Sequence, residues 1–251
     1  MADIAGWTRT SHTADSKTHD IYRKGVGPGV VLIHEAPGLT TAVIEFAEKV
    51  VAAGYTVVMP HLFGKVGRSG SLAETLDLVP RMCVSREFTV IALRRSPPMA
   101  VWLRSLAREL HDEVGGPGVG AIGMCFTGGF ALAMMVDAPV EAPVVAQPAM
   151  PAPLGARRKA DIGLSDRDLE AVKRRAAAGC PVLGLKYADD PSVGTRFDTL
   201  RRELGDAFIA VELPGKGHST LTDGRSDMAV DRVLSFFAER LKGQAPGATQ
   251  G

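Results

Sequence analysis

The sequence has little cysteine and almost no net charge. Its three cysteines, Cys83, Cys125 and Cys180, are odd in number, widely spaced and without a C-x-x-C pair. This pattern argues against a disulfide framework and a cysteine zinc site, and it favours a reducing compartment. The 29 basic and 28 acidic residues leave a net charge of +1. We therefore expect no partner among nucleic acids, because such a balance offers no basic surface for a phosphate backbone.

Long apolar runs are also missing. No stretch approaches the ~18 apolar residues of a membrane span, and the first residues lack the apolar run of a signal peptide. We expect a soluble, cytoplasmic protein without a membrane partner. The sequence does not distinguish a monomer from a small homo-oligomer.

Metal and nucleotide motifs are absent as well. The six histidines show no H-x-x-x-H spacing, and no Walker sequence occurs. A G-x-G-x-x-G match at residues 118–123 precedes and occupies a predicted strand, whereas a dinucleotide loop must follow a strand and open a helix. The sequence therefore predicts neither a metal site nor a dinucleotide site.

What is present is the composition and pattern of an α/β protein. Of the 251 residues, 45% are hydrophobic and 23% are charged, as in ordinary soluble proteins. Short apolar runs bounded by turn residues predict buried strands at 29–34, 56–59, 119–123, 142–146, 181–186 and 207–213. Apolar residues at helical spacing predict helices at 42–53, 99–114, 164–178 and 230–241.

The alternation of strands and helices predicts a mostly parallel central sheet with helices on both faces. We expect one domain over residues 1–242 and a disordered tail over 243–251. Residues 64–98 are expected to cover the C-terminal edge of the sheet, and residues 149–163 are expected to form a loop.

The most informative segment is GVGAIGMCFTGG at residues 118–129. A predicted strand ends just before Cys125, and a predicted helix follows at once. This layout is typical of a nucleophile elbow, usually G-x-S-x-G, in which a strained turn lifts the nucleophile above the sheet. Gly123 fits the first glycine, whereas Thr127 replaces the second. Cys125 is therefore the candidate nucleophile, and a buried core cysteine is the alternative reading.

A base and an acid follow in the order of an α/β-hydrolase. The strand at 181–186 leads into Asp189 and Asp190, and the strand at 207–213 leads into a glycine-flanked His218. Because the carboxyl ends of parallel strands gather at one edge, these side chains are expected to meet Cys125. Strand alternation allows only one of the two aspartates to face His218, and the residues alone leave that choice open.

The loop after the first long strand predicts the oxyanion hole. In this fold the second backbone donor comes from that loop, so we assign the N–H groups of Ala36 and Phe126. Glu35 lies next to this site, where a carboxylate would repel a developing negative charge. An interaction with the thiol would explain its presence; a solvated loop residue is the alternative.

These residues together resemble the dienelactone hydrolase family, the carboxymethylenebutenolidase-like branch of the α/β-hydrolases. The similar pieces are VVLIHEAPGL at 30–39, PHLFGK at 60–65, the cysteine elbow, the strand end with Asp190 and the Gly-His-Ser turn. The resemblance implies Cys125 as nucleophile, Asp190 as triad acid and His218 as triad base. It further implies that Glu35 takes the thiol proton when substrate binds, and that no cofactor is needed.

Two positions depart from the family pattern. Members that act on dienelactone hold its carboxylate with two arginines, and this chain has Lys65 and Thr222 at those positions. Lysine supplies charge without the bidentate fork of arginine, so Lys65 is a candidate substrate-binding residue. The reaction class is retained, while the natural substrate and its acyl group are not specified.

We therefore predict a hydrolase of lactone or carboxylic ester bonds that acts on a small molecule through an acyl-enzyme. A thioesterase on the same fold is one alternative. A non-catalytic protein that uses the elbow thiol for binding or redox sensing is another. Cys83 and Cys180 are expected to be packing residues.

Overall fold

The computed structural model describes residues 3–70, 74–75, 77–78, 88, 94–136, 139–150 and 155–243. Cys83, the tail at 244–251 and much of the predicted cover at 64–98 lie outside the described residues. No helix in the described part of the chain is long and apolar enough to cross a bilayer.

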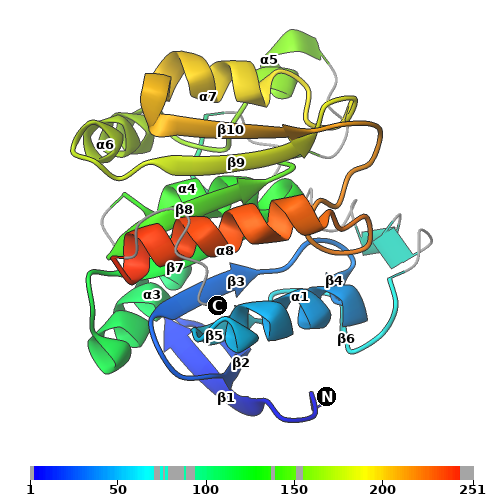
Figure 1. Ribbon diagram of the computed structural model, residues 1–251, viewed down its shortest axis with the longest axis vertical. Helices are drawn as coiled ribbons and strands as arrows, with labels where there is room; N and C mark the ends of the chain where they lie inside the picture. The colour runs from blue at the N-terminus through cyan, green and yellow to red at the C-terminus, as the bar shows by residue number, and fades with distance from the viewer. Residues whose placement is uncertain are drawn as a thin grey trace, which may run out of the picture.

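The centre of the molecule is an eight-stranded sheet in the order β1-β2-β5-β3-β7-β8-β9-β10 (Figure 1). Its strands are β1 (Thr8–Ala14), β2 (Lys17–Lys24), β3 (Gly29–Ile33), β5 (Thr56–Pro60), β7 (Val119–Met124), β8 (Val140–Ala146), β9 (Val182–Tyr187) and β10 (Phe208–Leu213). All pairs from β5 to β10 are parallel, whereas β1 pairs with β2 and β2 with β5 in antiparallel fashion. The predicted fold class, a mostly parallel α/β-hydrolase sheet, is confirmed.

The antiparallel hairpin of β1 and β2 was not among the predicted strands. Its side chains are mostly exposed or half-buried, so it lacks the continuous apolar run that marks the central strands. Its turn carries Asp15 and Ser16, both at positive φ (49° and 59°). Asn-Gly is the usual signal for such a turn, and the sequence does not display it.

The helices cover both faces of the sheet. They are α1 (Thr41–Ala52), α3 (Met99–Val114), α4 (Gly128–Met134), α5 (Gly155–Ala160), α6 (Asp166–Ala177), α7 (Arg196–Leu204) and α8 (Asp227–Leu241), with the 3-10 turns η1 (Cys125–Thr127) and η2 (Gly205–Ala207). Residues of α1 and α8 pack in one apolar cluster, and residues of α3, α4, α6 and α7 pack in the other. Figure 1 shows α1 and α8 in front of the sheet.

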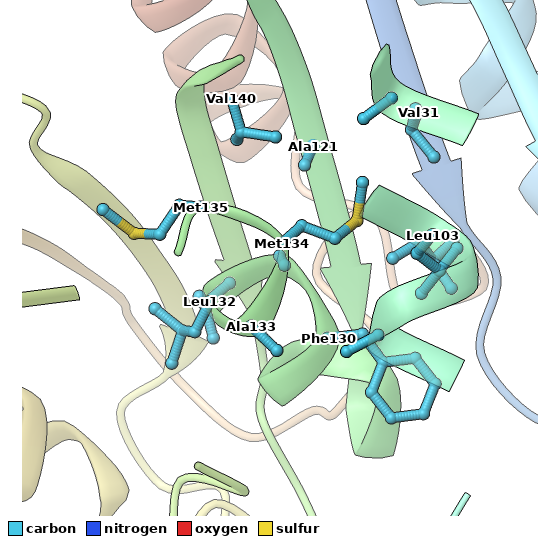
Figure 2. Packing of buried hydrophobic residues seen from close by; sticks show 14 of the residues in the cluster. Val31, Leu103, Ala121, Phe130, Leu132, Ala133, Met134, Met135 and Val140 are labelled. Carbon is cyan, nitrogen blue, oxygen red and sulfur yellow. The ribbon is translucent and has the colours of Figure 1, made fainter. Parts of the chain in front are cut away.

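Helix α4 is buried against the sheet at the point where the elbow emerges. Figure 2 shows Met134 of α4 near Ala121 of β7, with Phe130 of α4, Val140 of β8 and Leu103 of α3 in the same cluster. Six of the seven residues of α4 are buried, which explains its lack of a polar face. This packing holds the helix that follows Cys125 in a fixed position on the sheet.

Three local features lie outside the main sheet. The predicted loop at 149–163 is wrong in part, because Gly155–Ala160 forms the short helix α5; none of its residues is buried, so no apolar periodicity marks it. Ser165 caps α6, since the Asp168 N–H donates to the Ser165 Oγ at 3.2 Å. Two smaller strands, β4 (Gly38–Leu39) and β6 (Lys65–Val66), pair outside the main sheet.

Candidate active site

Cys125 sits at a strained turn between β7 and η1. Its φ is 55°, in the left-handed region that non-glycine residues seldom occupy. Gly123 makes the turn possible, because a Cβ there would lie 2.2 Å from the carbonyl oxygen of Thr127. The Cys125 side chain is half-buried. This is the geometry expected of a nucleophile elbow, in which strain presents the nucleophile above the sheet.

Thr127 occupies the position that is usually the second glycine of the elbow. Its side chain is fully buried, and its Oγ accepts from the Met124 N–H at 2.9 Å and donates to the Met124 carbonyl at 2.7 Å. The threonine therefore closes the turn with its own hydroxyl. Threonine in place of glycine is therefore compatible with the elbow, because its hydroxyl forms hydrogen bonds with the turn backbone. A bulkier apolar side chain would crowd that backbone.

His218, Asp190 and Ser192 form a hydrogen-bonded group at the ends of β9 and β10. The His218 Nδ1 lies 2.8 Å from Asp190 Oδ2 and 2.9 Å from Ser192 Oγ. The Ser192 hydroxyl donates to Asp190 Oδ1, which also accepts from the Ser192 N–H at 3.0 Å. The Cys125 sulfur also acts on the His218 ring, because it raises the pKa of His218. Because Nδ1 faces Asp190, Nε2 is the atom left for the sulfur.

The protonation of His218 follows from these contacts. Burial lowers the pKa of His218, but the hydrogen bonds to Asp190 and Cys125 outweigh burial and raise the pKa to about 10. Burial raises the pKa of Asp190, but the hydrogen bonds from His218 and Ser192 outweigh burial, so the net pKa lies below its ordinary value. The pair is therefore an aspartate beside an imidazolium at neutral pH.

The neighbouring Asp189 has a different environment. Its side chain is exposed, and its backbone N–H donates to the Gly215 carbonyl at 3.3 Å. Of the two aspartates that the sequence left open, Asp190 is thus the one in contact with His218. The loop of His218 also packs on Tyr187, because a Cβ at Gly217 would lie 2.7 Å from that ring.

Ser192 was not recognised from the sequence. It lies two residues after Asp190, the offset at which an aspartate carboxylate accepts a backbone N–H in an Asx turn. That spacing was the available signal. It does not show that the hydroxyl would also reach His218, since this contact depends on the approach of the β10 loop.

Glu35 is buried, with 4% of its surface exposed, and is held by three side chains. The hydroxyl of Thr222 donates to Oε1, and Ser219 Oγ and Gln147 Nε2 donate to Oε2 at 3.2 Å each. Burial raises the pKa of Glu35, and the hydrogen bonds from Thr222, Gln147 and Ser219 together with the charge of His218 oppose that rise. In the described part of the chain, no hydrogen bond joins Glu35 to Cys125.

Thr222 stands where the family pattern has an arginine, and it contacts Glu35. Gln147, in turn, accepts the N–H of Thr220 at 3.2 Å and its hydroxyl at 2.6 Å. The loop after His218 is therefore tied to Glu35 and to the end of β8. The sequence contains no signal for the role of Gln147, which lies far from both partners along the chain.

His34 holds the backbone next to Glu35. Its Nε2 accepts the Leu62 N–H at 3.2 Å, so its Nδ1 carries the proton and donates to the Glu35 carbonyl at 3.0 Å. The ring is fully buried, and this burial lowers the pKa of His34 to about 3. A neutral His34 therefore fixes the Glu35 backbone.

The two predicted oxyanion donors lie at the same edge of the sheet. Phe126 follows Cys125 directly, and Ala36 follows β3, the strand that pairs in parallel with β7. Ile33 is in register with Gly123, so the chain leaves both strands at the same level. This register brings the backbone of both loops to the side of the sheet where Cys125 emerges.

Cys125 opens into a cavity with mainly apolar walls and a few charged groups. The cavity is lined by Phe88, Arg95, Pro97, Cys125, Phe126, Gly129, Phe130, Pro148, Ala149, Met150, Asp161, Ile162, Gly163 and Arg196. Lys65 is not part of this lining. It forms an ion pair with Glu74 in a separate depression that also contains Arg68. The structure thus brings Cys125, His218 and Asp190 together and leaves Lys65 apart from them.

The remaining cysteine that the structure describes is Cys180. It is buried and its thiol donates weakly to the Val140 carbonyl at 3.5 Å; burial raises its pKa. Among the described residues, no group of three histidine, cysteine, aspartate or glutamate side chains is arranged to hold a metal ion.

Comparisons with solved structures agree with this fold. A dienelactone hydrolase of Anabaena variabilis ATCC 29413 is similar at 18% identity with a TM-score of 0.65, over 94% of this chain and 98% of that one. A putative dienelactone hydrolase of Klebsiella pneumoniae is similar at 14% identity with a TM-score of 0.66, over 95% and 98%. An α/β-hydrolase of Penicillium sp. sh18 is similar at 13% identity with a TM-score of 0.68, over 94% and 99%.

Comparison with curated proteins found no match. The family comparison is specific: the model of the dienelactone hydrolase family matches residues 20–240. That range contains the elbow, the His218 loop and Glu35. The chain therefore belongs to the dienelactone hydrolase family, and it is a hydrolase with the α/β-hydrolase fold.

Proposed function

We propose that this protein hydrolyses carboxylic ester or lactone bonds of a small molecule through a Cys125-His218-Asp190 triad. The observation that carries the proposal is the 2.8 Å hydrogen bond between His218 and Asp190 beside the elbow, where the Cys125 sulfur also raises the pKa of His218. Nucleophile, base and orienting acid are the three roles that such a constellation requires.

The reaction would run in two halves. The Cys125 sulfur attacks the acyl carbonyl, and the backbone N–H groups of Phe126 and Ala36 stabilise the oxyanion. As the tetrahedral intermediate collapses, the C–O bond breaks and His218 gives its proton to the leaving alkoxide. A water molecule then attacks the thioester, gives its proton to His218, and releases the acid and the free Cys125.

The charge state of His218 supports this order of events. Its pKa of about 10 means that the ring holds a proton at neutral pH, beside the sulfur that must carry negative charge. An imidazolium next to a thiol favours the thiolate, which is the nucleophilic form. The same proton is then available to the leaving group, and Asp190 keeps the ring in the required orientation.

Glu35 is proposed to act in thiol activation, as the family resemblance implies. In the structure its carboxylate is occupied by Thr222, Ser219 and Gln147. Direct contact with the sulfur would therefore require substrate to displace one of these donors.

The test compares Cys125→Ala with wild type and with Cys180→Ala as a matched control. We expect Cys125→Ala to lose all but a few percent of the hydrolysis of p-nitrophenyl acetate while keeping the wild-type circular dichroism spectrum. Cys180 is buried in the apolar core, where its thiol donates to the Val140 carbonyl, and it does not line the Cys125 cavity, so Cys180→Ala should remain active. Mass spectrometry of the quenched wild-type reaction should show an acyl adduct on Cys125.

Parallel assays with lactones, oxygen esters and thioesters identify the preferred bond. Faster turnover of thioesters than of their oxygen esters would favour a thioesterase. Full hydrolytic activity in Cys125→Ala would exclude covalent catalysis at this residue. A reactive Cys125 without turnover of any of the three classes would instead indicate a binding or redox-sensing protein.

A further inference from the structure

Arg196, the first residue of α7, is buried in the wall of the Cys125 cavity. Only 2% of its surface is exposed. Its guanidinium donates to four backbone carbonyls: Nε to Asp161 at 2.8 Å, Nη1 to Val193 at 2.8 Å and Ser192 at 3.2 Å, and Nη2 to Arg158 at 2.6 Å. Within the described residues, its guanidinium forms no ion pair with a carboxylate.

This placement is electrostatically unfavourable by itself. A buried charge that is not paired is costly, and the N-terminus of a helix is the end that disfavours a cation. Burial lowers the pKa of Arg196, and the charges of Asp161 and Cys125 oppose that effect. Negative charge at the Cys125 sulfur would therefore offset part of the cost of burying Arg196.

Other charged groups line the cavity but differ in position. Arg95 is exposed at its rim and has no polar partner in the described structure. The carboxylate of Asp161 accepts the backbone N–H groups of Gly163 and Arg94. Arg196 is the buried cation of this lining. The hydrogen bonds from its guanidinium to four backbone carbonyls fix the orientation of the side chain.

The same guanidinium contacts the loop that carries the triad acid. The carbonyls of Ser192 and Val193 both accept from Nη1. Ser192 contacts Asp190 and His218 through its hydroxyl. A shift of Arg196 would therefore move the loop on which the orientation of His218 depends.

We propose that Arg196 is a positioning residue that supplies a fixed positive charge to the Cys125 cavity and holds the Asp190–Ser192 loop in place. The charge stabilises the thiolate and the oxyanion that forms during attack, and the fork maintains the geometry of the loop. The catalytic consequence rests on the proposed function, whereas the effect on the thiol does not.

The experiment measures alkylation of Cys125 by iodoacetate, which is anionic, and by iodoacetamide, which is neutral. Mass spectrometry of the Cys125 peptide gives both rates, and their ratio reports the charge that the sulfur experiences. The variants are Arg196→Met, which removes the charge, and Arg196→Lys, which keeps it without the fork. Thr199→Val is the matched control, because the Thr199 hydroxyl ties α7 to the Ala160 carbonyl at 2.9 Å without any charge.

We expect the iodoacetate-to-iodoacetamide ratio to fall roughly five- to tenfold in Arg196→Met, as one cation in a partly desolvated site predicts. It should stay within about twofold of wild type in Arg196→Lys and Thr199→Val. Ester turnover should fall in Arg196→Lys, because the compact ammonium of lysine has three donors and cannot bond to all four carbonyls that the guanidinium holds.

A ratio in Arg196→Met equal to that of wild type would overturn the proposal. Circular dichroism would reveal whether Arg196→Met folds. If it does not, Arg196→Lys is the deciding variant. An iodoacetate-to-iodoacetamide ratio as low as that of free glutathione would refute the electrostatic role, whereas a retained ratio with reduced ester turnover would support both roles. Alkylation requires no turnover. Full activity of Cys125→Ala would thus defeat the proposed function and leave the test of Arg196 intact.

Discussion

The contact between His218 and Asp190 makes a quantitative prediction for Asp190→Asn. The substitution keeps the shape of the side chain and removes its charge. Burial lowers the pKa of His218, and the hydrogen bonds to Asp190 and Cys125 raise it to about 10. Without the carboxylate, the pKa of His218 should fall toward its ordinary value of 6.5. Asp189→Asn is the matched control, since the Asp189 side chain is exposed and should leave His218 unchanged.

The same contact makes the free energy of unfolding depend on pH. The pKa of His218 is raised in the folded state, so its contribution is complete below about pH 6.5 and is lost as pH rises through about 10. The pKa of Asp190 is lowered, so its contribution is present above about pH 3.8 and is lost as pH falls through its folded-state pKa. Both contributions are present together between about pH 4 and 6.5.

The size of the effect is limited by solvent. Each unit of pKa shift corresponds to ~1.36 kcal/mol, but 34% of the His218 side chain is exposed, which screens the interaction. We therefore expect Asp190→Asn to lower the free energy of unfolding by about 2 kcal/mol at pH 5.5, and by less at pH 9.5.

The assay combines two measurements. Proton NMR of the His218 ring gives its pKa in wild type, Asp190→Asn and Asp189→Asn. Denaturant unfolding at pH 5.5 and 9.5 gives the free energies, and hydrolysis of p-nitrophenyl acetate gives activity. An unchanged pKa of His218 in Asp190→Asn would refute the coupling. Loss of activity in Asp189→Asn with normal activity in Asp190→Asn would reverse the assignment of the acid.

Two further predictions concern the elbow and Glu35. Gly123→Ala should destabilise the protein by about 1–3 kcal/mol and reduce ester hydrolysis more than tenfold, because its Cβ would meet the Thr127 carbonyl at 2.2 Å; wild-type thermal stability and turnover would contradict this. Glu35→Gln should lower turnover. Because burial raises the pKa of Glu35 above 4.5, wild-type stability relative to Glu35→Gln should decline as pH rises through that raised pKa. If the difference in unfolding free energy between wild type and Glu35→Gln is constant from pH 4 to pH 9, the pKa of Glu35 is not raised by burial.

Local hydrophobic patterns in the sequence predicted most of the strands and helices of the fold. The central strands are continuous apolar runs because both of their faces are covered by helices, so their positions could be predicted to within a few residues. The hairpin of β1 and β2 and the helix α5 could not be predicted, since neither buries a continuous apolar face. Their structure depends on turn conformations and on contacts with neighbouring segments, and neither produces a periodic pattern in the local sequence.

For the site, the sequence was enough to predict the candidate residue types and their order: an elbow cysteine, an aspartate after β9 and a histidine after β10. Motif spacing can do this because strand ends of a parallel sheet converge on one edge. It could not choose between Asp189 and Asp190, nor show that Ser192, Gln147 and Thr222 join the network. Those contacts arise from the packing of the folded chain, which also brings Arg196 to the wall of the Cys125 cavity. Each depends on where a loop side chain points after segments far apart in sequence have packed together, and that direction is set by burial and hydrogen bonding in three dimensions.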